Sequence, residues 1–318
     1  MSSRSTPMAD PQHWLITGAS SGIGRLAAER LQQRGHRLTV ICRSQERAEQ
    51  TLGWLSGDSR VLLADLADLD QVQAIDQALL EKDEALDGLL LNAGLQYAGH
   101  RQVRWSAQGL ELTIAVNHLA HQRLAMDLLP LLLRSAAPRL VITASEVHNP
   151  ASGGGRVGSP AGLGDLSGLE NHSAMVNGEQ RFDADKAYKD SKLCNLLMGR
   201  YLAQLHPQLP VICWSPGLVI PRGRDGFFRN SREANPLGQA LFGFVARDLL
   251  RLTERPERAA ELLERLVLDP AMPTGFSYWS NELLGPGRHR FACSETSAEA
   301  ADDAKAARLW QVSEQLIQ

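Results

Sequence analysis

Two residues four positions apart, Tyr188 and Lys192, have the side chains of a proton-transfer pair. They lie in a segment in which Leu193, Leu196 and Leu197 recur at helical spacing, and on a helix residues i and i+4 share one face. A free phenol has a pKa near ~10, and a neighbouring ammonium lowers it by favouring the phenolate. This spacing also occurs on ordinary helix surfaces, so the prediction depends on the residues upstream.

A glycine-rich turn near the N-terminus predicts a dinucleotide site. Residues 13–17 form an apolar run typical of a strand, and helical spacing follows the turn until Gly35 ends it. Glycines let a pyrophosphate approach the backbone, and a helix N-terminus offers free N–H groups. The predicted contact residues are Gly18, Ser20, Ser21, Gly22, Ile23 and Gly24.

The residue after the second predicted strand, 38–42, selects the cofactor. NAD-binding folds have an acidic residue near this strand end, on the ribose 2′-OH, whereas this chain has Arg43, which suits a 2′-phosphate. The sequence therefore favours NADPH, and the alternative is that Arg43 is an ordinary surface residue at a helix start. Asp65 and Leu66, after a third strand, are expected to meet the adenine.

Apolar strands alternate with helices along the chain, which predicts an α/β, Rossmann-type, doubly wound parallel sheet. Ligands bind such sheets at the carboxyl ends of the strands. The expected strands are 13–17, 38–42, 60–64, 86–91, 139–143, 210–214 and, as the last, 276–279. The expected helices include 71–80, one long helix over 110–133, the Tyr188 helix, 256–268 and 298–317.

The sequence predicts a flexible N-terminus, 1–12, and one domain, 13–318, with a C-terminal helical elaboration. Residues 149–184 read as a long functional loop. Residues 219–253, irregular at first and then an amphipathic helix, are expected to form a lid over a hydrophobic ligand. Simple packing on the domain is an equal alternative, and contact with a membrane surface is a weaker one, because the polar face is not strongly basic.

Composition excludes several classes of function. The 318 residues are 43% hydrophobic, which rules out wholesale disorder, and a net charge of −3 without a basic block predicts no nucleic-acid partner. Four scattered cysteines without metal-ligand spacing suggest reduced thiols and no metal. Because no signal peptide or transmembrane run is evident, we expect a soluble cytoplasmic protein, with peripheral contact to a membrane as an alternative and the oligomeric state left open.

Together these landmarks resemble the short-chain dehydrogenase/reductase superfamily. The glycine turn is followed, in that superfamily's order, by Asn92-Ala93-Gly94, Asn117, Ser145, Tyr188-x-x-x-Lys192 and Pro216-Gly217. The resemblance implies that Tyr188 donates the proton and that Lys192 lowers its pKa and holds the nicotinamide ribose. It also implies that Ser145 orients the reacting group or Tyr188 and that Asn117 anchors a water in the proton relay. Spacing alone leaves open that Asn117 is a capping or core asparagine.

A narrower resemblance covers nearly the whole chain. Five segments are similar to light-dependent protochlorophyllide reductase: Asn117-His118-Leu119, the run 163–169, the Tyr188 segment, Tyr278-Trp279-Ser280 and the ending at 305–314. The resemblance implies that NADPH gives a hydride to the C17=C18 double bond of photoexcited protochlorophyllide, a proton following from Tyr188. The substrate would then be a flat, hydrophobic tetrapyrrole.

Two departures from that family lie at the expected substrate pocket. Leu218 stands where the family has a cysteine, and Val147, beside His148, stands where it has a threonine. Ser145-Glu146-Val147-His148 is instead similar to retinol-dehydrogenase-like reductases. Three functions therefore stay open: a protochlorophyllide reductase, a light-independent carbonyl reductase or alcohol dehydrogenase on a retinoid-like substrate, and a non-catalytic pigment- or nucleotide-binding protein.

Overall fold

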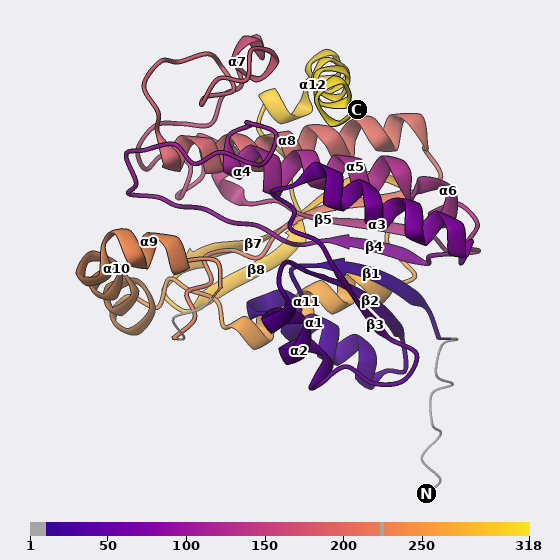
Figure 1. Ribbon diagram of the computed structural model, residues 1–318. Helices are drawn as coiled ribbons and strands as arrows, with labels where there is room; N and C mark the ends of the chain where they lie inside the picture. The colour runs from indigo at the N-terminus through magenta and orange to yellow at the C-terminus, as the bar shows by residue number, and fades with distance from the viewer. Residues whose placement is uncertain (1–10, 223–225) are drawn as a thin grey trace, which may run out of the picture.

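An eight-stranded sheet runs through the middle of the computed structural model, which describes residues 11–222 and 226–318 (Figure 1). The strand order is β3-β2-β1-β4-β5-β6-β7-β8; successive neighbours from β3 to β7 pair in parallel, and β8 runs antiparallel to β7. This confirms the predicted doubly wound α/β sheet. The strands are β1 (His13–Thr17), β2 (Arg37–Cys42), β3 (Arg60–Leu63), β4 (Gly88–Leu91), β5 (Arg139–Thr143), β6 (Pro210–Ser215), β7 (Gly275–Gly285) and β8 (Arg288–Cys293).

Helices cover both faces of the sheet, as Figure 1 shows. One face carries α1 (Gly22–Gln33), α2 (Gln45–Leu52) and α11 (Pro256–Leu268). The other carries α3 (Leu69–Lys82), α5 (Ala120–Asp127) and α8 (Ala184–Leu205), with α12 (Asp303–Ile317) packed outside them. Because side chains alternate along a strand, Trp14 and Ile16 join the apolar cluster of α1 and α11, and Leu15 joins the cluster beneath α5 and α8.

The predicted Tyr188 helix is α8, which has 22 residues. It begins where the Asp183 carboxylate accepts hydrogen bonds from the N–H groups of Asp185 and Lys186. Leu193, Leu196 and Leu197 are completely buried between the sheet and α12. Burial of this stripe holds the helix in place, so its remaining faces are free to carry polar groups.

The single long helix expected over 110–133 is wrong. The segment divides into α4 (Leu112–Ile114), a π-helical turn η1 (Ala115–Leu119), α5, and α6 (Leu129–Leu132). Pro130 lacks the N–H that a continuous helix needs, so α5 ends at Asp127 and α6 begins with the proline in its first turn. The π turn contains Asn117 and is a local widening of the helix of the kind that often occurs at functional sites.

The expected end of the sheet is also wrong. β7 continues six residues past the predicted 279, and β8 returns beside it as an antiparallel edge. Gly285 and Gly287 both have positive φ, as the reversal between the strands requires. β8 carries the exposed residues Arg288 and Arg290, so its sequence lacks the apolar run that marks the other strands. The C-terminal elaboration is therefore helical and β-stranded, and its last helix begins at Asp303, after a short 3-10 turn, η4 (Glu299–Ala301).

Several irregular segments also differ from expectation. Residues 219–235 contain α9 (Arg229–Ala234), followed by α10 (Pro236–Gly243) and a second π turn, η3 (Phe244–Leu249), while 223–225 lie outside the described residues. The 149–184 loop holds one short helix, α7 (Ser167–Glu170). Of the expected flexible 1–12, residues 1–10 lie outside the described part, and Gln12 is hydrogen-bonded to His36 and Arg37.

Candidate active site

A cavity of about 1620 Å³ opens at the carboxyl edge of the parallel strands. Of the residues that the sequence singled out for catalysis or binding, all but Asn117 line it. These are Gly18, Ser20, Ser21, Gly22, Ile23, Gly24, Arg43, Asp65, Leu66, Asn92, Ala93, Gly94, Ser145, Val147, His148, Tyr188, Lys192, Pro216, Gly217 and Leu218. Residues separated by two hundred positions therefore face one space, because parallel strands bring their carboxyl ends to the same edge.

The glycine turn has the shape of a pyrophosphate cradle. A Cβ on Gly18 would lie 2.7 Å from Ala93 Cα, and one on Gly24 would lie 2.4 Å from the Gly18 carbonyl oxygen. Both positions therefore require glycine. Gly22 has φ +59° and nothing within 4 Å of an added Cβ, so it opens onto free space at the first residue of α1. The turn thus offers a close-approach surface beside a helix N-terminus, which fits a dinucleotide phosphate.

Thr17 joins this turn to the next strand end. Its Oγ1 accepts hydrogen bonds from the N–H groups of Asn92 (2.9 Å) and Ala93 (3.0 Å). The same oxygen lies 2.9 Å from His121 Nε2, and His121 Nδ1 lies 3.0 Å from the carbonyl oxygen of Asn117. The hydroxyl therefore donates to Nε2, while Nδ1–H donates to Asn117. His121 was missed in the sequence, although it stands one helical turn after Asn117.

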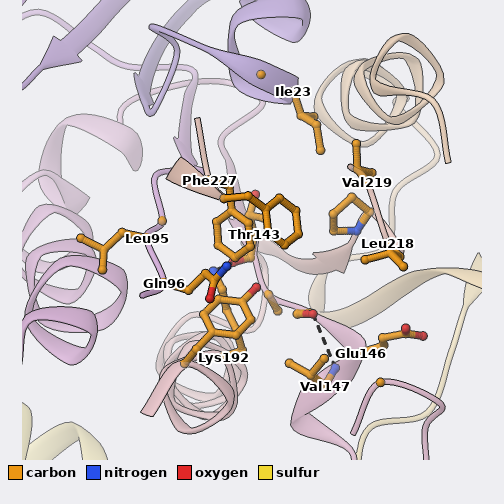
Figure 2. Close-up of a pocket in the computed structure, with 18 of the residues that line it drawn as sticks. Ile23, Leu95, Gln96, Thr143, Glu146, Val147, Lys192, Leu218, Val219 and Phe227 are labelled. Carbon is orange, nitrogen blue, oxygen red and sulfur yellow. Dashed lines mark hydrogen bonds between the residues drawn. The ribbon is translucent and has the colours of Figure 1, made fainter. Parts of the chain in front are cut away.

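Tyr188 and Ser145 line the cavity and are joined by a side-chain hydrogen bond, and Lys192 and Thr143, both labelled in Figure 2, line the same space. Lys192 Nζ lies 5.7 Å from the centre of the Tyr188 ring and donates to the Thr143 carbonyl oxygen at 2.9 Å. The Ser145 hydroxyl accepts a 3.5 Å hydrogen bond from Val147 N–H, the dashed line of Figure 2. The predicted pair, Tyr188 and Lys192, therefore shares one helix face. Ser145, which follows β5, is the third side chain of this candidate catalytic group.

Burial dominates the proton affinities of the pair. It raises the pKa of Tyr188 above its ordinary value, and hydrogen bonding to the Ser145 side chain opposes this only in part. Burial also lowers the pKa of Lys192, to about 7. The lowering of the Tyr188 pKa expected from spacing is therefore absent here, because the ammonium is directed at the Thr143 carbonyl and because both groups are desolvated.

Asn117 lies behind the cavity wall and is completely buried. Its side-chain oxygen accepts from the Leu95 N–H at 2.8 Å, and its Nδ2 donates to Leu95 O and to Ser191 Oγ, each at 3.0 Å. Ser191 Oγ in turn donates to the Tyr188 carbonyl at 2.7 Å. Asn117 therefore positions the strand end and α8 relative to each other. Its predicted role in holding a water stays a prediction.

At the far end of the cofactor side, Arg43 is exposed directly after β2, and Arg47 lines the cavity beside it. Asp65 accepts a 3.0 Å hydrogen bond from the Ala67 N–H, and Leu66 is buried. A cation after β2 and a backbone turn after β3 are positions suited to a 2′-phosphate and an adenine, respectively.

The predicted substrate residues lie on the other side of Ser145. In Figure 2, Leu218 and Val219 face Val147 and Glu146 across this part of the cavity. Gly217 has φ +76°, and a Cβ there would lie 2.7 Å from the Asn281 carbonyl oxygen, so glycine is needed to aim Leu218. His148 is 1% exposed: Nδ1 lies 2.7 Å from Ser145 O and Nε2 accepts from the Ser297 N–H. Its imidazole therefore supports the wall, and no ring nitrogen is left for a ligand.

Sequence reasoning missed several lining residues of the substrate side. Phe227 lies 5.2 Å from the Tyr188 ring, between ring centres, and Phe228 packs against it. Arg104, Glu146 and the β7–β8 hairpin also contribute. Their chain positions carry no recognisable signal, because only folding brings the segments after β4, β6 and β7 together.

Within 11–222 and 226–318, no group of three or more His, Cys, Asp or Glu side chains is arranged to hold a metal ion. Over the same residues, no helix has the length and apolar character needed to cross a membrane.

The proteins to which this chain is similar include short-chain dehydrogenases and protochlorophyllide reductases. The family model described as short chain dehydrogenase matches residues 12–156. Protochlorophyllide reductase A, chloroplastic, of Oryza sativa subsp. japonica is 35% identical over 322 residues, which cover 95% of this chain and 80% of that protein. Protochlorophyllide reductase of Avena sativa is 34% identical, with 95% and 98% covered.

Solved structures with the same fold extend the comparison. An uncharacterised protein from Mycobacterium paratuberculosis superimposes with a TM-score of 0.66 at 24% identity, covering 96% of this chain and 93% of that one. A short chain dehydrogenase from Shigella flexneri, complexed with NADP, gives a TM-score of 0.59 at 24% identity, covering 85% and 97%.

Proposed function

The chain belongs to the short-chain dehydrogenase/reductase superfamily, in the group that includes the protochlorophyllide reductases, and on this premise we propose that it is an NADPH-dependent reductase of the C17=C18 double bond of protochlorophyllide. Superfamily membership makes it an oxidoreductase. The identity of the cofactor, NADPH, and of the substrate, protochlorophyllide, is what we propose beyond this class of enzyme.

NADPH is the proposed cofactor because each part of it has a fitting group in the cavity. The cradle at Gly18, Gly22 and Gly24 would take the pyrophosphate, and Arg43 the 2′-phosphate. Lys192 would hold the nicotinamide ribose. Its ammonium donates to the Thr143 carbonyl in this structure and would turn from that carbonyl to the ribose. When bound, the nicotinamide supplies the hydride.

Tyr188 is the proposed proton donor. Its raised pKa keeps the phenol protonated at neutral pH, so it holds the proton that the reaction consumes. Ser145 hydrogen-bonds the phenol and the opposite side of the cavity is free to receive a substrate. Asn117 and Ser191 fix the carbonyl of Tyr188 and thereby the rotation of α8, which keeps the phenol in place.

The observation that carries the pigment assignment is the extent of the similarity, which covers 95% of this chain, including the segments that form the substrate side. The cavity supports it further, since Leu218, Val219, Phe227 and Phe228 give that side apolar and aromatic walls. Such walls suit a flat, hydrophobic macrocycle.

The test is the absorbance of purified protein mixed with NADPH and protochlorophyllide, first in the dark and then under illumination. A red shift on mixing, followed by light-dependent formation of chlorophyllide, is expected. NADH in place of NADPH is the matched control and should support far less conversion. Pigment binding without conversion in the light would overturn the proposed reaction.

A second candidate is a light-independent carbonyl reductase or alcohol dehydrogenase acting on a retinoid-like substrate. Leu218 and Val147 favour it, because both replace polar side chains of the protochlorophyllide reductases with apolar ones at the cavity wall. Oxidation of NADPH by retinal in the dark, with no response to protochlorophyllide, would select this function.

A further inference from the structure

Six arginine and lysine side chains line the cavity, and five of them are accounted for. Arg43 and Arg47 stand at the proposed 2′-phosphate end. Lys192 donates to the Thr143 carbonyl, and Arg229 lies 3.9 Å from Glu233. Lys189 donates to the carbonyls of Gly155, Val157 and Ser159 and so pins the loop that forms one wall. The sixth cation is Arg104.

Arg104 is a half-buried cation whose side-chain contacts are with neutral groups, and the Glu111 carboxylate lies beyond one of them, where it accepts from the Tyr97 hydroxyl. Its guanidinium carbon lies 5.4 Å from the centre of the Tyr97 ring, Nη1 donates to Asn230 Oδ1 at 3.3 Å, and Nη2 lies 3.5 Å from His100 Nε2. Within the part of the chain that the structure describes, no carboxylate comes within ion-pair distance of it. A guanidinium has five N–H donors, so several stay available to a ligand.

The environment holds Arg104 in place before any ligand arrives. The backbone N–H of Arg104 donates to the Tyr97 hydroxyl at 3.2 Å, and the backbone carbonyl of Arg104 accepts from the Leu112 N–H at 2.9 Å. Asn230 is itself tied to the Gln96 carbonyl at 3.4 Å. A partly desolvated cation without a counter-ion is unfavourable, and an anionic ligand would offset that cost.

The opposite side of the cavity has the reverse charge. The carboxylate of Glu146 has no hydrogen bond or ion pair with any described residue, and Glu282 is a neighbouring negative charge. Glu282 itself forms an ion pair with Arg290 and accepts a hydrogen bond from Ser294. His289, the basic group near Glu146, lies 3.8 Å from Glu254. Figure 2 places Glu146 on the other side of the site from Gln96, the residue joined to Arg104 through Asn230.

We propose that Arg104 is a specificity-determining residue that binds the carboxylate of an otherwise apolar substrate, and that Glu146 repels that carboxylate from the opposite end. The two charges thereby orient the substrate across Tyr188. This inference rests on the proposed function, in which the substrate is protochlorophyllide, a macrocycle with one free carboxylate. It goes beyond that function by assigning the end of the cavity that the carboxylate occupies.

The experiment compares dark binding of protochlorophyllide and of its methyl ester, which lacks the negative charge, in the presence of NADPH. The native protein should bind the acid about tenfold or more tightly than the ester, since charge-assisted hydrogen bonds supply that difference. Arg104→Met, which keeps the apolar stem over Tyr97, should bind both at the affinity of the ester. Arg104→Lys should recover part of the preference, because it restores charge without the planar fork.

Arg101→Met is the matched control, because Arg101 is exposed on the same loop and does not line the cavity. It should retain the native preference, and all variants should keep the native melting temperature. Equal loss of acid and ester binding in Arg104→Met would indicate a structural role and would overturn the inference, as would an unchanged preference.

The proposed reaction and the inference fail separately in this design. If the protein binds the acid in preference to the ester but does not convert protochlorophyllide in the light, the proposed reaction is contradicted and the proposed role of Arg104 is supported. If the pigment does not bind, retinoate and methyl retinoate take its place in the same comparison. Absence of acid preference in both pairs, or of any binding, would overturn the inference.

Discussion

The two ends of the cavity are built in different ways. The cofactor end lies on the carboxyl ends of β1, β2, β3 and β4, and its turns are joined by short contacts such as Thr17 Oγ1 to the N–H groups of Asn92 and Ala93. The substrate end is assembled from loops and from the β7–β8 hairpin, beside α9 and α10 in Figure 1. Its walls are side chains such as Leu218 and Phe227 rather than backbone.

This difference fits the departures from the protochlorophyllide reductases that the sequence resemblance predicts, at Leu218 and Val147. A Cβ at Gly18 or Gly24 would collide with backbone atoms, so the cofactor end tolerates few substitutions. Leu218 and Val147 are partly exposed to the cavity, where a change of side chain alters the ligand's surroundings without displacing a strand. The two ends should therefore respond separately to mutation, and the predictions below test that separation.

The largest effect is expected where the ends meet. Tyr188→Phe removes the hydroxyl that holds the proton, and general acid catalysis accounts for about 10²–10⁴-fold in rate. The rate of product formation should fall by at least the lower factor, while NADPH affinity stays unchanged. Stopped-flow absorbance and cofactor titration measure the two. Tyr201→Phe, on the same helix but packed against Trp310, is the control and should keep full activity.

Arg43→Ala should affect only the cofactor end. Loss of charge-assisted hydrogen bonds to a 2′-phosphate should weaken NADPH binding by about tenfold to a hundredfold and leave NADH binding nearly unchanged. Fluorescence titration with both cofactors measures this, with Arg47→Ala in parallel to separate the two lining arginines. An equal change for NADPH and NADH would contradict the assignment of Arg43.

Lys192 should make cofactor binding depend on pH. Burial lowers its pKa to about 7, so in the free protein the amine is largely neutral at pH 8, and an anionic dinucleotide favours the ammonium. NADPH binding at pH 8 should therefore take up a proton, whereas at pH 6 the amine already carries it. Calorimetry in buffers of different ionisation enthalpy measures the uptake, which Lys192→Met should abolish.

The same shift has a consequence for stability. An unfolded lysine keeps its proton up to a pH of ~10.4, whereas Lys192 loses it in the folded protein near 7. Between these values the unfolded chain binds more protons, so this lysine makes the free energy of unfolding rise with pH. If the free energy of unfolding of the Lys192→Met variant rose with pH as steeply as that of the native protein, the assignment of this pH dependence to Lys192 would be contradicted.

The smallest effect is expected at the substrate end. Leu218→Cys removes part of a half-buried side chain and should cost about 1 kcal/mol or less of stability, because the site opens onto the cavity. NADPH affinity should not change, and pigment affinity should change only severalfold. Thermal melting and the two titrations measure this. A marked loss of NADPH affinity would show that the two ends are coupled.

Local patterns were sufficient to predict the shape of the glycine turn and the shared helix face of Tyr188 and Lys192. The turn at Gly18 to Gly24 and the Tyr188–Lys192 spacing each lie within a few residues, where helical period and glycine geometry decide the structure. The predictions were wrong where residues distant in the sequence determine the local structure. β8 pairs only with β7, and the π turn around Asn117 depends on contacts with Leu95 and Ser191.

The amino-acid sequence alone determined the parallel part of the sheet, its alternation of strand and helix, and the groups that we propose to handle phosphate and proton, since each depends on spacing within one element. Only the tertiary structure decided what those groups experience. Burial reversed the expected pKa shift of Tyr188, backbone groups occupied both ring nitrogens of His148, and Arg104 and Glu146 were brought to the lining of one cavity. Desolvation and partner choice depend on neighbours far away in the chain, which no local pattern encodes.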